Sequence, residues 1–310
     1  MSDFDLHSSE VFFREGFVPF AEANVSIASS PVLYGLSIYT VFSVSWNKQA
    51  KELYAFRLED HYKRLINSAR IMDFHSFCDE WTYERFEKAM LDLIRRNHVQ
   101  EDALVRVTVF IDELIAGTKI HGLKNSLSAY IYPMGEILPL HGVNLCISSW
   151  VRNADNSIPA KAKINGSYVN ASLMKNEALL NGYDDAIALD HNGHVAEGTV
   201  ANLFIVRDGK LVTPDTSTDI LEGITRDSII ELAPTLGMRV EERSIDRTEL
   251  YKSSEAFLCG TSAKITPILS IDKRPIGDGK VGTFAKRFME AYDTIQHGHE
   301  DKFAKWRMTV

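Results

Sequence analysis

The stretch Ala162-Lys163-Ile164-Asn165-Gly166-Ser167-Tyr168 is the most informative part of this chain. A lysine taken alone is usually a solvated surface cation. This one is followed along the chain by Glu197-Gly198-Thr199, by Leu221-Glu222-Gly223-Ile224-Thr225-Arg226-Asp227 and by Gly260-Thr261-Ser262. The four segments together supply an amine, an acid and two Gly/Thr turns, and solvated surface residues do not explain that combination.

These groups match what a phosphorylated pyridine aldehyde needs from a protein. The lysine amine can form a Schiff base with the aldehyde. A carboxylate can keep the ring nitrogen protonated, so that the ring withdraws electrons. Backbone N–H groups at a turn or at the start of a helix can bind the phosphate. The sequence therefore indicates a binding site for pyridoxal 5'-phosphate.

At these residues the chain resembles the fold-type IV pyridoxal-phosphate enzymes, and most closely the branched-chain amino acid aminotransferases. The resemblance extends from about Phe12 to about Tyr292 and is densest between Ser148 and Asp190. It implies an α/β (α+β) fold with a small N-terminal domain, a larger C-terminal domain and the cofactor cleft between them.

Proline and glycine residues punctuate the chain at 133–142, where we expect the loop between the domains. The small α/β domain is then expected at 1–132, and the large domain, which carries the cofactor lysine, at 143–310. Apolar periodicity predicts strands and helices alternating along both parts. Strands are expected at 11–20 (a hairpin), 38–46, 52–56, 103–111, 128–132, 143–150, 186–189, 202–206 and 256–259, and helices at 58–71, 83–97, 170–181 and 225–236.

Composition narrows the functional class. The chain has 310 residues, a net charge of −8, 45% apolar and 25% charged residues. A length of this order can bury two cores, and the negative charge argues against a nucleic-acid partner. Its three cysteines are widely spaced, so we expect a reducing compartment and no disulfide framework or metal site. No apolar run could cross a bilayer, and the acidic start lacks a signal core, so we expect a cytoplasmic protein without a membrane partner.

The resemblance implies a role for three residues at the cofactor ring. Lys163 would be the Schiff-base lysine and would also move the proton between substrate and cofactor. Lys161 is the rival, but only Lys163 lies five residues before the tyrosine. Glu197 would pair with the ring nitrogen, although alone it would read as a solvated turn residue. Tyr168 would hydrogen-bond the phenolic oxygen, although a core tyrosine is equally consistent with its position.

The phosphate site is expected to have several contributors. Arg64 matches the phosphate arginine of the family and offers a forked donor. Ile224 and Thr225 would offer backbone N–H groups at the start of a helix, where the dipole favours an anion. Thr261 would add its hydroxyl. Without the resemblance, Arg64 would be a helix-surface cation and Gly260-Thr261 an ordinary turn.

On the substrate side, apolar residues that include Tyr34 and Tyr39 are expected to hold an aliphatic side chain. The resemblance implies that Arg106 binds the γ-carboxylate of glutamate. Turn amides at Ser262 and Ala263 would hold the α-carboxylate.

The chain departs from the branched-chain pattern at Tyr39-Thr40-Val41, where those enzymes carry an aromatic residue, a glutamate and a glycine. The change removes a carboxylate from the expected pocket wall. Leu104 also stands where those enzymes usually have a tyrosine, two residues before Arg106. These departures bear on the amino acid specificity more than on the cofactor.

The expected function is transfer of the amino group of leucine, isoleucine or valine to 2-oxoglutarate by a ping-pong mechanism. Two alternatives share the scaffold. A D-amino acid or (R)-amine transaminase is similar around Tyr39, where an aromatic residue opens the same strand, and a 4-amino-4-deoxychorismate lyase resembles the chain at Tyr39-Thr40, where threonine replaces the acid. A scaffold protein that kept the fold without the chemistry is a further alternative. The resemblance also implies a homodimer or higher homo-oligomer, in which Tyr34 and a loop at 115–119 reach the neighbouring active site.

Overall fold

The computed structural model describes residues 4–135 and 138–310. The chain forms two compact units. The first consists of Met1–Gly135, Ala162–Gly166 and Thr294–Val310, and the second of Glu136–Lys161 and Ser167–Asp293. Residues 136 and 137, within the expected connection at 133–142, lie outside the described residues.

The first unit is built on a seven-stranded sheet in which every neighbouring pair is antiparallel. The expected hairpin forms between β1 and β2, with Arg14 at a positive φ of 61° in its turn. Strand β3 pairs with both β4 and β5, so it lies inside the sheet, and ten of its eleven residues are buried. In sheet order the strands are β16 (Arg307–Thr309), β4 (Glu52–Phe56), β3 (Ser37–Asn47), β5 (Ala103–Ile111), β6 (Asn125–Pro133), β1 (Glu10–Phe13) and β2 (Gly16–Pro19).

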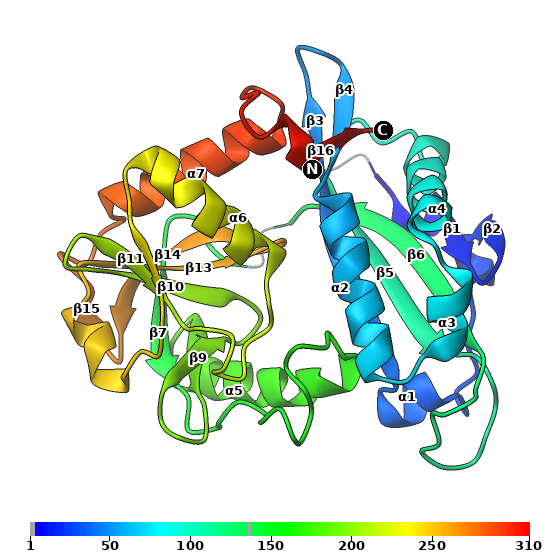
Figure 1. Cartoon of the computed structure of the whole chain (residues 1–310), viewed down its shortest axis with the longest axis horizontal. Coiled ribbons are helices and arrows are strands. Elements are labelled where there is room, and N and C mark those ends of the chain that lie inside the picture. The colour runs from blue at the N-terminus through cyan, green and yellow to red at the C-terminus, as the bar shows by residue number, and fades with distance from the viewer. Residues whose placement is uncertain (1–3, 136–137) are drawn as a thin grey trace. The chain divides into compact units, whose positions relative to one another are not determined.

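Helices pack on this sheet through their apolar faces. Helix α2 (Leu58–Ile71) packs against β3, and α4 (Tyr83–Arg96) packs against β1 and β6 (Figure 1). The hydroxyl of Thr82 accepts a hydrogen bond from the backbone N–H of Arg85 at 3.3 Å and so caps α4. The remaining helices of this unit are α1 (Ser30–Tyr34), α3 (His75–Glu80), η1 (Leu6–Ser8), η2 (Phe20–Glu22) and η6 (Ala304–Trp306).

The second unit is built on a nine-stranded mixed sheet. The pairs β11–β12, β14–β7 and β7–β8 are parallel, and the other pairs are antiparallel. Apolar residues of β7, β10, β13 and β14 form its main core. The strands are β12 (Val240–Glu242), β11 (Lys210–Thr213), β10 (Asn202–Arg207), β13 (Glu255–Gly260), β14 (Lys264–Ile271), β7 (Val143–Ile147), β8 (Asp185–Leu189), β9 (Val195–Gly198) and β15 (Arg274–Pro275).

Three α-helices accompany this sheet. Helix α6 (Ile224–Leu232) packs against β13, and α5 (Tyr168–Leu180) packs against β8. Helix α5 begins two residues before the expected start at Asn170. The long α7 (Thr283–Gln296) was not predicted, and its last residues, from Thr294, belong to the first unit. The short helices of the second unit are η4 (Ala233–Leu236) and η5 (Arg247–Lys252), and η3 (Asn165–Ser167) lies where the chain passes from the first unit to the second.

The grouping of the chain differs from the expected boundaries at two places. Lys163 was expected in the large second domain, but its segment belongs to the first unit because it forms a bridge and hydrogen bonds with β3 and α2. The C-terminal residues also belong to the first unit, since β16 extends the first sheet by pairing with β4. Throughout residues 4–135 and 138–310, no helix combines the length and the apolar character needed to cross a membrane.

Candidate active site

The backbone of the Lys163 segment is fixed to two elements of the first unit. The carbonyl oxygen of Lys163 accepts a hydrogen bond from the N–H of Tyr39 at 2.9 Å, and Ile164 forms a bridge with Ile38. The N–H of Lys163 donates to the hydroxyl of Ser68 on α2 at 3.1 Å. Strand β3 and helix α2 therefore hold the lysine from either side of its Cα.

A close approach of two glycines holds the end of the same segment. The N–H of Gly166 donates to the carbonyl of Gly35 at 3.2 Å. Gly35 has a φ of +67°, and a Cβ built on it would lie 2.7 Å from the Cα of Gly166. Because both the conformation and the contact exclude a side chain, only glycine fits at position 35.

Three expected site residues meet at the ring of Tyr39, which is 5% exposed. The Nζ of Lys163 lies 4.8 Å from the ring centroid, and the Cζ of Arg106 lies 3.8 Å from it. The guanidinium of Arg106 also donates to Oδ1 of Asn165 at 2.6 Å, and Asn165 donates to the hydroxyl of Ser37 at 2.8 Å. The aromatic ring and the amide thus fix the arginine with respect to the lysine segment.

Arg64 of α2 is half-buried and contacts a pair of buried polar residues, Thr40 and His61. Its Nη2 donates to the hydroxyl of Thr40 at 3.3 Å, and this hydroxyl lies 2.9 Å from Nδ1 of His61. Burial lowers the pKa of His61 well below its usual range, and the charges of Arg64, Arg57 and Lys163 lower it further. A neutral imidazole therefore contacts Thr40, the residue at which the chain departs from the branched-chain pattern.

The buried state of His61 makes stability depend on pH. Its folded-state pKa is depressed, so the unfolded chain takes up a proton near pH 6.5 that the folded chain does not. The free energy of unfolding should therefore fall as the pH drops below about 6.5, by up to about 1.4 kcal/mol per pH unit from this one group. Urea unfolding followed by circular dichroism between pH 7.5 and about 5 would measure the slope. His61→Gln should make that slope shallower, and an unchanged slope would mean that His61 is charged in the folded protein.

Glu197 lies on β9 in the second unit and is 4% exposed. Its Oε1 forms a 2.7 Å ion pair with Arg152. The side chain of Arg152 is 11% exposed and that of Glu197 is 6% exposed. Its Oε2 accepts from Nδ2 of Asn202 at 2.9 Å and from the N–H of Leu221 at 3.3 Å. One cation and two dipoles therefore favour the ionised carboxylate. Glu197 is therefore buried and ion-paired, unlike the solvated turn glutamate that its position in the sequence, taken alone, would predict.

Asn202 connects this carboxylate to the start of α6. Its Nδ2 also donates to the carbonyl of Leu221 at 2.9 Å. Its Oδ1 occupies the space beside Gly223, since a Cβ on that glycine would lie 2.0 Å away. Gly223 is the N-cap of α6, and the buried residues Ile224 and Thr225 follow it. The expected phosphate-binding helix start is thus held next to Glu197.

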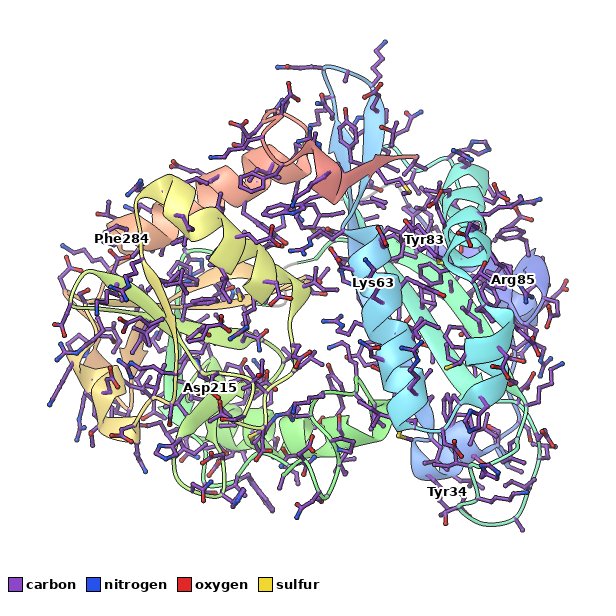
Figure 2. The ribbon with its side chains drawn as sticks, viewed as in Figure 1. Tyr34, Lys63, Tyr83, Arg85, Asp215 and Phe284 are labelled. Carbon is purple, nitrogen blue, oxygen red and sulfur yellow. The ribbon has the colours of Figure 1, made fainter. Side chains whose placement is uncertain are left out.

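The remaining expected residues occupy separate elements. Tyr168 begins α5, and its ring packs against a small apolar cluster of that unit. Thr261, Ser262 and Ala263 form the turn between β13 and β14, with Ala263 4% exposed. Tyr34 ends α1 and is 44% exposed (Figure 2).

The expected residues are divided between the two units. The first contains Tyr34, Tyr39, Arg64, Arg106 and Lys163, and the second contains Tyr168, Glu197, Ile224, Thr225, Thr261, Ser262 and Ala263.

Sequence reasoning missed His61, Arg152 and the role of Asn202. His61 had a readable signal, because it lies three residues before Arg64 and so on the same face of a predicted helix. Arg152 and Asn202 gave no such signal, since their partner Glu197 lies on another element.

Comparison with known proteins defines the class. Residues 37–271 match the family model described as "Amino-transferase class IV". The chain belongs to this family, which confirms the resemblance inferred from its motifs and the mixed α/β fold of fold type IV.

Individual relatives are described more specifically than the family model, as branched-chain aminotransferases. A probable branched-chain-amino-acid aminotransferase of Aquifex aeolicus is 37% identical over 302 residues, which cover 96% of each chain. The branched-chain-amino-acid aminotransferase of Escherichia coli K12 is 34% identical over 94% of this chain and 95% of its own. Among solved structures, the Thermoproteus uzoniensis branched-chain aminotransferase with norvaline has a TM-score of 0.92 at 36% identity, covering 97% of this chain and 99% of its own. The holo, PLP-form structure of the Thermobaculum terrenum enzyme has a TM-score of 0.92 at 33% identity, with 98% and 99% covered.

Proposed function

We propose that this chain is a pyridoxal-phosphate-dependent branched-chain-amino-acid transaminase. It transfers the amino group of leucine, isoleucine or valine to 2-oxoglutarate in two half-reactions of a ping-pong scheme. Relatives described as branched-chain aminotransferases, similar over nearly the whole chain, support the substrate class. The residues that the chain offers for the cofactor and the substrate support the chemistry.

Each unit contains residues of the types that the cofactor requires. Pyridoxal phosphate, when bound, supplies an electron-withdrawing ring that stabilises negative charge at the substrate α-carbon. Glu197 would pair with the ring nitrogen, and its buried ion pair with Arg152 favours the ionised carboxylate that this role requires. Arg64 and the first backbone N–H groups of α6, at Ile224 and Thr225, would bind the phosphate.

Two further contacts would complete the cofactor site. Tyr168 would hydrogen-bond the phenolic oxygen, and the hydroxyl of Thr261 would bind the phosphate.

The fixed backbone of Lys163 is the observation that carries the proposal. The hydrogen bonds from Tyr39 and to Ser68 hold its Cα, so the amine can move only through the side chain. A lysine held in this way can bind the cofactor covalently. It can also carry a proton between the substrate α-carbon and the cofactor without leaving the site.

Residues of the substrate side would orient the amino acid. Tyr39 and Tyr34 would contact the aliphatic side chain, and the backbone at Ser262 and Ala263 would bind the α-carboxylate. Arg106 would bind the γ-carboxylate of glutamate or 2-oxoglutarate. Its stacking on Tyr39 and its bond to Asn165 support that role, because they fix the guanidinium before substrate arrives.

Arg64→Ala should weaken pyridoxal phosphate binding. Loss of a charged hydrogen bond costs about 2 kcal/mol, which corresponds to roughly a 30-fold higher dissociation constant. Lys63→Ala is the matched control, because Lys63 lies next to Arg64 with its side chain 61% exposed and paired with Glu59 at 2.8 Å (Figure 2). Fluorescence titration of the apoenzyme with the cofactor would measure both variants. An unchanged dissociation constant for Arg64→Ala would remove this residue from the phosphate site.

The threonine at position 40 is also compatible with a second function. The carboxylate of the branched-chain pattern is replaced by a hydroxyl that contacts Arg64 and His61. A D-amino acid or (R)-amine transaminase, or a 4-amino-4-deoxychorismate lyase, could use such a pocket wall. The lyase would release pyruvate without needing an amino acceptor.

A donor panel separates these functions. Purified protein with added pyridoxal phosphate would be assayed with L-leucine, L-isoleucine, L-valine, D-alanine, (R)-1-phenylethylamine and aminodeoxychorismate, each with 2-oxoglutarate or pyruvate. Glutamate formation should be fastest with the three branched-chain L-amino acids. Faster turnover of D-alanine or the amine, or acceptor-independent pyruvate release, would overturn the branched-chain assignment. Colourless protein that turns over no donor would indicate a scaffold.

The assembly we propose is a homodimer in which Tyr34 and residues 115–119 contribute to the neighbouring active site. Three exposed apolar residues of α1, Val32, Leu33 and Tyr34, support a covered face there. Sedimentation velocity should show no monomer at micromolar concentration. Mixing Lys163→Ala subunits with subunits altered at Tyr34 should restore activity in one site of each mixed dimer. An active monomer would contradict the proposal.

We also propose a cytoplasmic location. The free thiols of Cys78, Cys146 and Cys259 support it, since they fit a reducing compartment. Cell fractionation would test it.

A further inference from the structure

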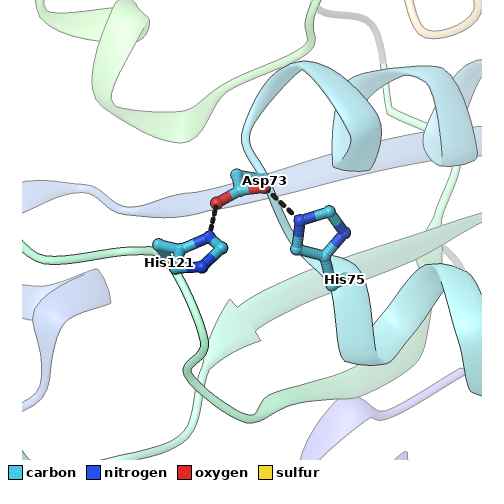
Figure 3. A group of neighbouring side chains, drawn as sticks. All are labelled: Asp73, His75 and His121. Atoms are coloured by element: carbon cyan, nitrogen blue, oxygen red, sulfur yellow. Dashed lines mark hydrogen bonds and ion pairs between the residues drawn. The ribbon is translucent and has the colours of Figure 1, made fainter.

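A cluster of two histidines and an aspartate lies in the first unit, where it shares no residue with the groups described above. Asp73 lies in the turn between α2 and α3, His75 is the first residue of α3, and His121 belongs to the connection between β5 and β6. Figure 3 shows the carboxylate of Asp73 between the two imidazoles. Its Oδ2 lies 2.7 Å from Nδ1 of His121, and its Oδ1 pairs with Nε2 of His75.

The geometry points to a metal site. One ligand atom from each of the three residues lies within 4.8 Å of the other two. Ligand atoms around tetrahedral zinc are roughly 3.4 Å apart, given Zn–N and Zn–O distances near 2.1 Å. The oxygen and nitrogen atoms now 2.7 Å apart would separate by less than about 1 Å to admit the ion. The imidazoles are 63% and 80% exposed, so they are free to make that adjustment.

The backbone holds one side of the cluster in place. Asp73 has a φ of +60°, and the N–H of Phe74 donates to the carbonyl of Ala69 at 2.8 Å, which closes the end of α2. The aspartate is thereby fixed at the start of α3, next to His75. By contrast, His121 lies at the end of an exposed stretch, with Ala116 to Lys119 all exposed. An ion bound by all three side chains would connect residues 116–121 to the end of α2 through its coordination bonds.

We propose that Asp73, His75 and His121 bind a divalent transition-metal ion of the zinc class. Two imidazole nitrogens and one carboxylate oxygen are ligands that Zn²⁺ accepts readily, and water would complete the coordination. The bound ion restrains the connection at residues 112–124. Cysteine spacing gives no hint of this site, because its ligands come from two segments 46 residues apart (75 to 121).

Titration of the full-length holoenzyme with ZnCl₂ tests the binding. Calorimetry should show one site that His121→Asn and His75→Asn each weaken by at least about tenfold, the loss expected when a ligand is removed. The matched control is His98→Asn. His98 is also exposed, and its φ of +49° is one that asparagine tolerates, so this variant should bind zinc like the wild type. Equal zinc binding by the wild type and the His121→Asn variant would overturn the proposal, as would no binding by the wild type.

Trypsin tests the restraint separately. Cleavage after the exposed Lys119 should slow at least about fivefold when Zn²⁺ is added to the wild-type holoenzyme. His121→Asn should be cleaved at one rate with and without zinc, which also controls for any action of zinc on trypsin. Equal protection of both proteins would show that the ion does not act through this cluster.

Discussion

Replacing Lys163 with alanine should lower kcat by at least about a thousandfold while the protein stays folded. The proposed function gives this one amine two tasks, the covalent attachment of the cofactor and the proton transfer, and alanine removes both. The fold should persist because the contacts that hold this segment use its backbone, which the substitution keeps. Steady-state rates with L-leucine and 2-oxoglutarate would measure the loss, and circular dichroism would check the fold.

Lys161→Ala is the matched control for this result. Lys161 lies two residues away and is exposed, so its loss should leave kcat nearly unchanged. Borohydride treatment of the holoenzyme, followed by mass spectrometry of its peptides, should find the cofactor attached to Lys163. If Lys161→Ala abolished the attachment and Lys163→Ala kept it, the two lysines would have been assigned the wrong way round.

Local patterns were enough to predict much of the secondary structure. The alternation and β-branched content of residues 38–46 predicted β3, and the apolar spacing of residues 58–71 predicted α2. Helix α7 had a comparable pattern, with buried Ala285, Phe288, Tyr292 and Ile295 at helical spacing, and could have been predicted. Strand β14 was harder, because Pro267 lies within it and argues against a strand that pairs on both sides.

Contacts between distant segments were beyond local patterns. The chain leaves the second unit at Ala162 and returns to it after Gly166 only because this segment bonds to β3 and α2. No periodicity near Lys163 encodes that pairing. The same reason hid Arg152, whose partner Glu197 lies 45 residues further along the chain (152 to 197). The motifs predicted residue types for the candidate site, while the partners that orient those residues required the structure.

Glu197→Gln should slow the single-turnover reaction with L-leucine by about a hundredfold or more. A neutral amide cannot keep the ring nitrogen protonated, and loss of one preorganised charge typically costs a factor of 10² to 10³. The variant should also lose roughly 3 kcal/mol of stability, because Arg152 would remain nearly buried without its anion. Stopped-flow absorbance and urea unfolding would measure the two effects.

A double variant separates the catalytic loss from the structural one. Arg152→Met together with Glu197→Gln removes both charges, so most of the lost stability should return, as it often does when a buried ion pair is replaced as a whole. Asn202 and the N–H of Leu221 can still donate to the amide oxygen at position 197, which keeps that side chain in place. The single-turnover rate should nevertheless stay as low as in Glu197→Gln, since neither residue then carries a carboxylate. Recovery of the rate along with the stability would mean that Glu197 serves the fold and that another acid pairs with the cofactor ring.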